Sequence, residues 1–234
     1  MNLPFTAEQF SQVFADYNEA VVVAPVVLMV PAILSVSAIL RQRPDAPRIV
    51  AGTLAFLWVW SGLVYHLIFF ARINPWALAF GGAFIAQGLW FVRAGRVAAV
   101  SEPGRRWRLR KTVGAVIVVY ALVGYPIVSV ILGHSWPAAP TFGAPCPVVI
   151  FTLGIWLWQG APGPRRLLII PLTWSALGST AALKLGMYQD WGMLIAGLST
   201  LVLIWNPSLH SLTDGKHSGS AAASRMPPAL HHGS

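Results

Sequence analysis

The sequence predicts an all-α integral membrane bundle of about seven transmembrane helices, preceded by a short amphipathic interfacial helix. Hydrophobic residues make up 56% of the chain and charged residues only 10%, whereas about 25% of a soluble domain is charged. Apolar runs long enough to cross a bilayer, roughly 20 residues, recur along the chain. The 234 residues therefore predict one helical bundle with no second soluble domain.

The basic residues predict how the bundle is oriented. The net charge is +9, but the lysines and arginines lie in short loops and in the tail rather than along one surface. All but Arg72 and Lys184 of the 16 basic residues fall on one side of the predicted membrane. By the positive-inside rule the N-terminus is outside and the C-terminus is cytoplasmic. This pattern argues against nucleic acid as a partner and favours the lipid bilayer of a bacterial inner membrane.

Residues 1–18 are predicted to form the amphipathic helix on the outer face. Thr6 and Gln9 have the spacing of a capping box. Phe10, Val13 and Tyr17 follow at helical spacing, which is typical of a helix that lies on a membrane surface.

Residues 19–206 are predicted to form the transmembrane domain, and residues 207–234 a disordered cytoplasmic tail, because the tail is rich in Ser, Ala, Gly and Pro. The predicted spans are Glu19–Leu40, Ile49–Phe70, Pro75–Ala99, Thr112–Leu132, Ala144–Gln159, Leu167–Gly186 and Trp191–Trp205.

The segment before the fifth span is rich in proline, so it cannot be helical throughout. The fifth span itself is shorter than the hydrocarbon core. We therefore expect residues 136–145 to dip inward as a re-entrant segment, which requires that protein cover it or that it line a wet cavity.

The distinctive polar residues of the predicted bundle all fall in its outer third. Ionisable groups at such depths are costly and mark functional sites, although polar loop residues need no such role. The sequence predicts an outward-facing polar pocket that binds or transports a small ligand or a metal ion. Its candidate residues are Glu19, Tyr65, His66, Asn74, His134, Thr141, Cys146, Lys184 and Asp190.

His66, His134 and Cys146 are also candidate metal ligands, since imidazole and thiolate bind zinc or copper. No local motif such as HExxH supports the site, so histidines bonded to backbone carbonyls or to a tyrosine remain the alternative. Cys146 begins a helix, where the helix dipole favours thiolate and an anionic ligand. A small residue that only fills space is the alternative for Cys146.

Several short motifs resemble a family of small bacterial multipass membrane proteins with a domain of unknown function. They include Tyr17-Asn18, Tyr65-His66, Gly124-Tyr125-Pro126 and, most distinctively, Pro140-Thr141-Phe142-Gly143-Ala-Pro145-Cys146-Pro147. The resemblance extends from Leu3 to about Trp205 and implies membrane location without an activity. An aromatic residue that the family would have near Val21 is absent.

A looser similarity is to the seven-helix membrane hydrolases that include alkaline ceramidases, in span count, orientation and histidines at one face. The chain lacks their paired histidines three residues apart. Retinal proteins differ further, because their lysine lies at mid-membrane in the last helix.

Three functions remain open from the sequence: the ligand-binding or transport pocket, a membrane-embedded metal-dependent hydrolase, and a structural or partner subunit whose polar cluster only packs helices. An oligomer is compatible with all three.

Overall fold

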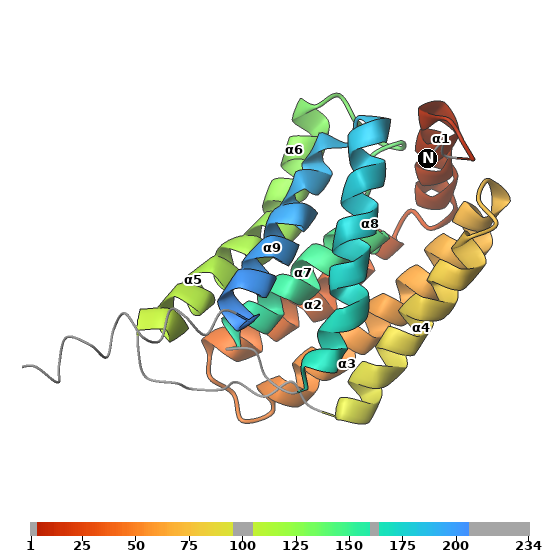
Figure 1. The fold of residues 1–234 in the computed structure, drawn as a ribbon. Helices are drawn as coiled ribbons and strands as arrows, with labels where there is room; N and C mark the ends of the chain where they lie inside the picture. Colours follow the sequence, from red (N-terminus) through yellow and green to blue (C-terminus); the bar gives the residue numbers. More distant parts are fainter. Residues whose placement is uncertain (1–3, 96–104, 160–163, 206–234) are drawn as a thin grey trace, which may run out of the picture.

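A computed structural model describes residues 4–95, 105–159 and 164–205, and the predicted tail lies outside them. The regular structure of the described residues is helical, which confirms the predicted all-α class; an isolated bridge between Phe142 and Ala144 is its only extended pairing. Figure 1 shows the helices packed as a bundle.

The N-terminal helix α1 (Ala7–Ala20) has the predicted capping box, in which the Thr6 hydroxyl accepts from Gln9 N and the Gln9 side chain accepts from Thr6 N. A break after Ala20 turns the chain by 82° into α2 (Ala24–Leu40). The helix of the first predicted span therefore begins at Ala24 rather than at Glu19.

The apolar face of α1 packs against the protein itself rather than lying on a membrane surface. Phe14 and Tyr17 contact Tyr65, with ring centroids 5.3 and 5.6 Å apart, and Tyr17 also contacts Phe69. The side chains of Phe14 and Tyr17 are both buried. This face is unavailable to lipid, in contrast to the interfacial arrangement that its amphipathic pattern predicts.

The second predicted span is the long helix α3 (Ala46–Trp60), which continues as a π-helix over Ser61–Phe69 and a 3-10 turn over Phe70–Arg72. The remaining helices are α4 (Ala77–Ala94), α5 (Arg105–Val119), α6 (Tyr125–Ile131), α7 (Pro145–Trp158), α8 (Ile169–Leu185) and α9 (Trp191–Trp205). A π-helical turn joins α5 to α6. A 3-10 turn precedes α8 at Arg165–Leu168, and another precedes α9 at Tyr188–Asp190.

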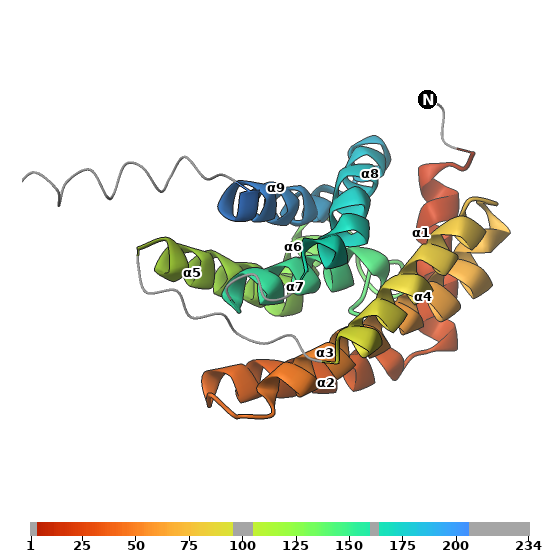
Figure 2. The same ribbon diagram turned by 60° about the horizontal axis from the view of Figure 1, so that its bottom comes forward.

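Helix α7 lies at the centre of the bundle, in contact with α5, α9, α8 and α3 (Figure 2). Every residue of α7 except Cys146 is buried. Its contact with α5 is close because Gly114 faces the α7 backbone, where an added Cβ would lie 2.3 Å from Trp158 N. The centre of the bundle is thus a short helix that is apolar on all sides.

Four helical stretches of the described residues are long and apolar enough to cross a membrane: Ala46–Arg72, Ala77–Ala94, Trp107–Ile131 and Arg165–Leu185. The bent pair α1–α2 would make a fifth. Helix α7 and the helix over Tyr188–Ile204 are apolar but shorter. Each of the seven predicted segments contains a helix, yet length and composition support four or five spans rather than seven.

The two ends of the bundle differ in charge. One end, here called the basic end, holds the α2–α3 turn, the C-terminus of α4 and the N-termini of α5 and α8 (Figure 1). The opposite end, here called the α1 end, holds α1, residues 132–144 and the α8–α9 connection. The described basic residues of the predicted cytoplasmic loops lie at the basic end: Arg41, Arg43, Arg48, Arg93, Arg105, Arg106, Arg108, Arg110, Lys111, Arg165 and Arg166.

Candidate functional site

The non-helical segment before α7 is fixed to the rest of the protein by buried side chains. Asn18 Nδ2 donates to the carbonyl oxygens of Pro137 and Ala139, the latter at 2.7 Å, and the predicted site residue Thr141 donates to Asn18 Oδ1 at 2.7 Å. Because Asn18 is fully buried, it takes the place of water for this segment. Residues 140–145 are mostly buried, whereas Trp136 is exposed and residues 137–139 are half-buried; a re-entrant position for residues 136–145 stays a prediction.

A second anchor holds the last turn of this segment. Ser61 Oγ donates to the carbonyl oxygen of Gly143 at 2.6 Å. Gly143 has a φ of 109°, and an added Cβ would lie 2.3 Å from Leu28 Cδ1, so only glycine fits here. These contacts set the position at which α7 begins, and with it the position of Cys146.

Asp190 is the centre of a buried polar group at the α1 end. Tyr125 Oη donates to Asp190 Oδ1 at 2.6 Å, and both residues are buried. The Cys146 thiol interacts with the same carboxyl group. Asp190 lies in the α8–α9 connection, where burial raises its pKa to about 6, although hydrogen bonds from Tyr125 and Cys146 oppose this rise. The carboxyl group therefore changes charge close to neutral pH.

Trp174 and His66 extend this group toward α3. Trp174 interacts with the Cys146 thiol, and its ring centroid lies 5.1 Å from that of His66. His66 is fully buried, and its Nδ1 lies 2.9 Å from the Ser61 carbonyl oxygen. Since a carbonyl only accepts, Nδ1 carries the proton in this contact. We call His66, Tyr125, Cys146, Trp174 and Asp190 the Asp190 cluster.

One polar atom of the Asp190 cluster, His66 Nε2, is buried without a hydrogen-bond partner. Leaving a buried polar group unpaired costs on the order of 1–3 kcal/mol. Cys146 is also only half-buried, whereas the other residues of α7 are buried. Native proteins satisfy such atoms with ordered water or a ligand.

The other predicted site residues do not belong to this cluster. Tyr65 is buried beside it and interacts electrostatically with Cys146 and Asp190. Asn74 accepts a hydrogen bond from Trp76 N at 3.1 Å, a local turn contact. Glu19 and Lys184 are exposed on their helices.

His134 lies in the loop after α6, outside the cluster. Its backbone N–H donates to the Ser129 carbonyl oxygen at 2.9 Å, and its Nδ1 has no hydrogen-bond partner. Across residues 4–95, 105–159 and 164–205, no group of three or more His, Cys, Asp or Glu side chains is arranged to hold a metal ion. The structure therefore brings Cys146 and Asp190 together but gives the predicted zinc or copper site no geometric support.

Comparison with known proteins adds one finding. Residues 7–213 match the model of a family of unknown function, DUF6064. The chain belongs to this family. No curated protein and no solved structure is significantly similar to it. The DUF6064 match covers every described helix from α1 to α9, in keeping with the resemblance to an uncharacterised family, and it assigns no chemistry to the Asp190 cluster.

Sequence reasoning missed three residues that organise this site. Asn18 and Tyr125 lie within the short motifs that carry the family resemblance, and that was the available signal. Trp174 gave no local signal, because a tryptophan in an apolar helix is ordinary.

Proposed function

We propose that this DUF6064 protein is a multipass protein of the bacterial cytoplasmic membrane that binds a small polar ligand from the outer side at the Asp190 cluster. The proposal includes seven spans, an outer N-terminus and a cytoplasmic C-terminus.

The surface of the bundle supports the membrane location. Large apolar side chains are exposed along helices that are long enough to cross a bilayer, among them Leu63, Leu78, Leu89, Val116, Ile127 and Leu177. A contiguous apolar exterior of this kind is unfavourable in water. The gathering of arginines at the basic end supports a cytoplasmic location for that end.

The burial of α7 supports its inclusion as a span despite its 14 residues. Non-helical backbone is tolerated at membrane depth where protein covers it. Residues 140–145 are covered by α1, α2 and the π-helix that follows α3, through Tyr17, Asn18, Leu28 and Ser61. A short helix in series with a covered segment can then complete one crossing.

The observation that carries ligand binding is His66 Nε2, which is buried without a hydrogen-bond partner beside the ring of Trp174. A cluster that only packed helices would pair its polar atoms internally. Aromatic walls and a buried carboxyl group suit a ligand with a positive charge or a strong hydrogen-bond donor. A metal-dependent hydrolase has less support, since its ligands do not gather.

Binding is favoured over transport by the character of α7. Between Pro147 and Trp158 its one hydroxyl side chain is Thr152, which donates to the Val148 carbonyl oxygen and accepts from Trp58 Nε1. Both bonds hold Thr152 within the core. Helix α7 thus offers a ligand no polar groups between the Asp190 cluster and the basic end.

The only cysteine of the chain makes a direct test possible. Intact cells are treated with two membrane-impermeant methanethiosulfonates, one cationic (trimethylammonium) and one anionic (sulfonate). We expect Cys146 to react from outside, several-fold faster with the cationic reagent because of Asp190, and expect Asp190→Asn to remove that preference. A Cys146→Ser variant carrying Ser135→Cys in the exposed loop reports intrinsic reactivity. Reaction of Cys146 only after denaturation would contradict the proposal.

A further inference from the structure

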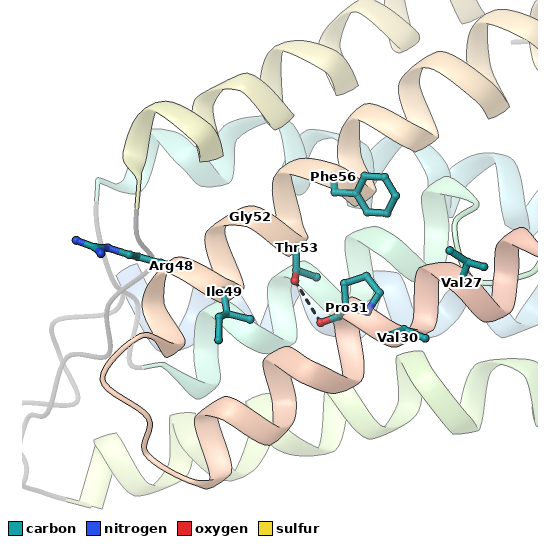
Figure 3. A pocket seen from close by; sticks show the side chains of 8 residues that line it. All are labelled: Val27, Val30, Pro31, Arg48, Ile49, Gly52, Thr53 and Phe56. Atoms are coloured by element: carbon teal, nitrogen blue, oxygen red, sulfur yellow. Dashed lines mark hydrogen bonds between the residues drawn. The ribbon is translucent and has the colours of Figure 1, made fainter.

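An open groove runs between α2 and α3, away from the Asp190 cluster. Figure 3 shows its lining: Val27, Val30 and Pro31 from α2, and Arg48, Ile49, Gly52, Thr53 and Phe56 from α3. Its volume is about 550 Å³, within the range of small-molecule sites, about 300–1,000 Å³. Apart from Arg48 and Thr53, the lining is apolar.

The groove is hollow for a local reason. Gly52 has no atom within 4 Å of the position that a Cβ would take, so the wall of α3 is recessed there. Next to it on α3, Thr53 bonds to the facing helix α2: its Oγ1 donates to the Pro31 carbonyl oxygen at 3.2 Å and accepts from Ser35 at 2.9 Å. These bonds draw the hydroxyl of Thr53 inward, so the groove presents hydrocarbon along its length.

One end of the groove is positively charged. Arg48 is exposed, and its side chain extends away from the apolar lining (Figure 3). It lies in the first turn of α3, where free backbone N–H groups add partial positive charge. The neighbouring carboxylate, Asp45, is held by Arg43 through two hydrogen bonds of 2.8 and 2.7 Å. Arg48 takes part in neither of the two ion pairs found among the described residues.

We propose that this groove binds an anionic phospholipid, with an acyl chain along Val27, Val30 and Phe56 and the phosphate at Arg48. The inference rests on the proposed membrane orientation, which puts Arg48 at the cytoplasmic interface. An apolar groove that ends in an unneutralised cation matches a hydrocarbon chain that ends in an anion, and basic sites on the cytoplasmic side recognise such head groups.

The test is retention of added lipid by the purified full-length protein, measured by native mass spectrometry with phosphatidylglycerol and, in parallel, phosphatidylcholine. Arg48→Gln should weaken phosphatidylglycerol binding about fivefold, the contribution of one basic residue near an anionic lipid. Gly52→Leu should fill the groove and reduce retention of phosphatidylglycerol at least as much.

Two variants serve as matched controls. Gly82 of α4 is likewise exposed with no atom near its Cβ position, and Arg93 ends α4 at the basic end. Gly82→Leu and Arg93→Gln should bind phosphatidylglycerol as the wild type does. Equal loss in all four variants, no loss in Arg48→Gln and Gly52→Leu, or equal retention of phosphatidylcholine by the wild type would each overturn the proposal.

An error in the proposed membrane location would be distinguishable from an error in the lipid site. In that case the wild type would be recovered without detergent in the aqueous fraction. A wild type that requires detergent but shows no dependence on Arg48 or Gly52 would refute the lipid site alone.

Discussion

Helices α2 and α7 have nearly the same kind of sequence and opposite surroundings. Neither contains a charged residue, and both are almost wholly apolar. Yet α7 is buried at every position except Cys146, whereas α2 buries Leu28, Ala32, Ser35 and Ala38 and exposes most of its valines and leucines. In an apolar bundle, hydrophobicity therefore does not determine which helix is central.

The difference lies in what each helix meets. At the α5–α7 contact the backbones approach so closely that Gly114 and Gly154 have no room for a Cβ, whereas Gly52 beside α2 has empty space. At its α1 end α7 is also held by a polar segment and the Asp190 cluster. Close packing thus encloses α7 in the bundle, and open packing beside α2 leaves the groove.

The largest expected effect comes from the same substitution at the two contacts. Gly114→Ala places a Cβ against the α7 backbone, so the helices must separate, at a cost of about 3 kcal/mol or more. Gly52→Ala meets nothing and should stabilise α3 by about 0.5–1 kcal/mol. Unfolding in detergent, followed by tryptophan fluorescence, measures both. Equal changes in the free energy of unfolding for the two variants would contradict this difference between the two contacts.

The second prediction concerns pH. Because burial raises the pKa of Asp190 from 3.8 to about 6, the folded state binds a proton more tightly than the unfolded state. The contribution of Asp190 to the free energy of unfolding should be greatest below pH 4 and should fall by roughly 3 kcal/mol as the pH rises through 6. The Asp190→Asn variant should lack this fall when its unfolding free energy is measured between pH 4 and 7.

Asp45, in the α2–α3 turn at the basic end, is the matched control for that measurement. The hydrogen bond from Arg43 lowers the pKa of Asp45, so the contribution of Asp45 to stability has the opposite pH dependence. That contribution is present above the ordinary pKa of an aspartate and is lost as the pH falls. Asp45→Asn should therefore keep the decline between pH 4 and 6. A decline that survived in Asp190→Asn would assign it to another group.

The third prediction sharpens the role of the segment before α7. Asn18→Ala removes the two N–H donors that pair with the carbonyl oxygens of Pro137 and Ala139 and the oxygen that accepts from Thr141. These groups are half-buried, and leaving them unpaired should cost about 2 kcal/mol. Asn74→Ala loses one turn contact and should cost less. Thermal unfolding of both variants gives the comparison, and a cost for Asn74→Ala equal to that for Asn18→Ala would contradict it.

The smallest expected effect belongs to a residue that sequence reasoning placed in the site. Glu19 is exposed, so Glu19→Gln should leave the rate of thiol labelling at Cys146 unchanged. A change as large as that in Asp190→Asn would show that Glu19 belongs to the site after all.

The sequence predicted most helices well because their signals are local. The capping box of Thr6 and Gln9 forms, α9 has the predicted bounds Trp191–Trp205, and α7 begins within one residue of its prediction. The number of spans was less predictable, since length alone does not say whether a short apolar helix crosses a membrane.

The candidate site was predictable only in part. Cys146 and Asp190 were selected as polar groups at helix ends, and the structure brings their side chains together; their role as site residues stays a prediction. Glu19 and Lys184 satisfied the same criterion, but they are exposed, because height along a helix does not specify the face. Tyr125 and Trp174 reach the cluster through long-range packing, which periodicity cannot show.

The most direct test of the account is the sidedness of single cysteines in intact cells. Ser135→Cys and Gln42→Cys are introduced separately into a Cys146→Ser background and compared with the wild-type Cys146. The account predicts that an impermeant thiol reagent labels Ser135→Cys and Cys146 from outside, and Gln42→Cys only after the cells are permeabilised. Labelling of Gln42→Cys in intact cells, with Ser135→Cys protected, would contradict it.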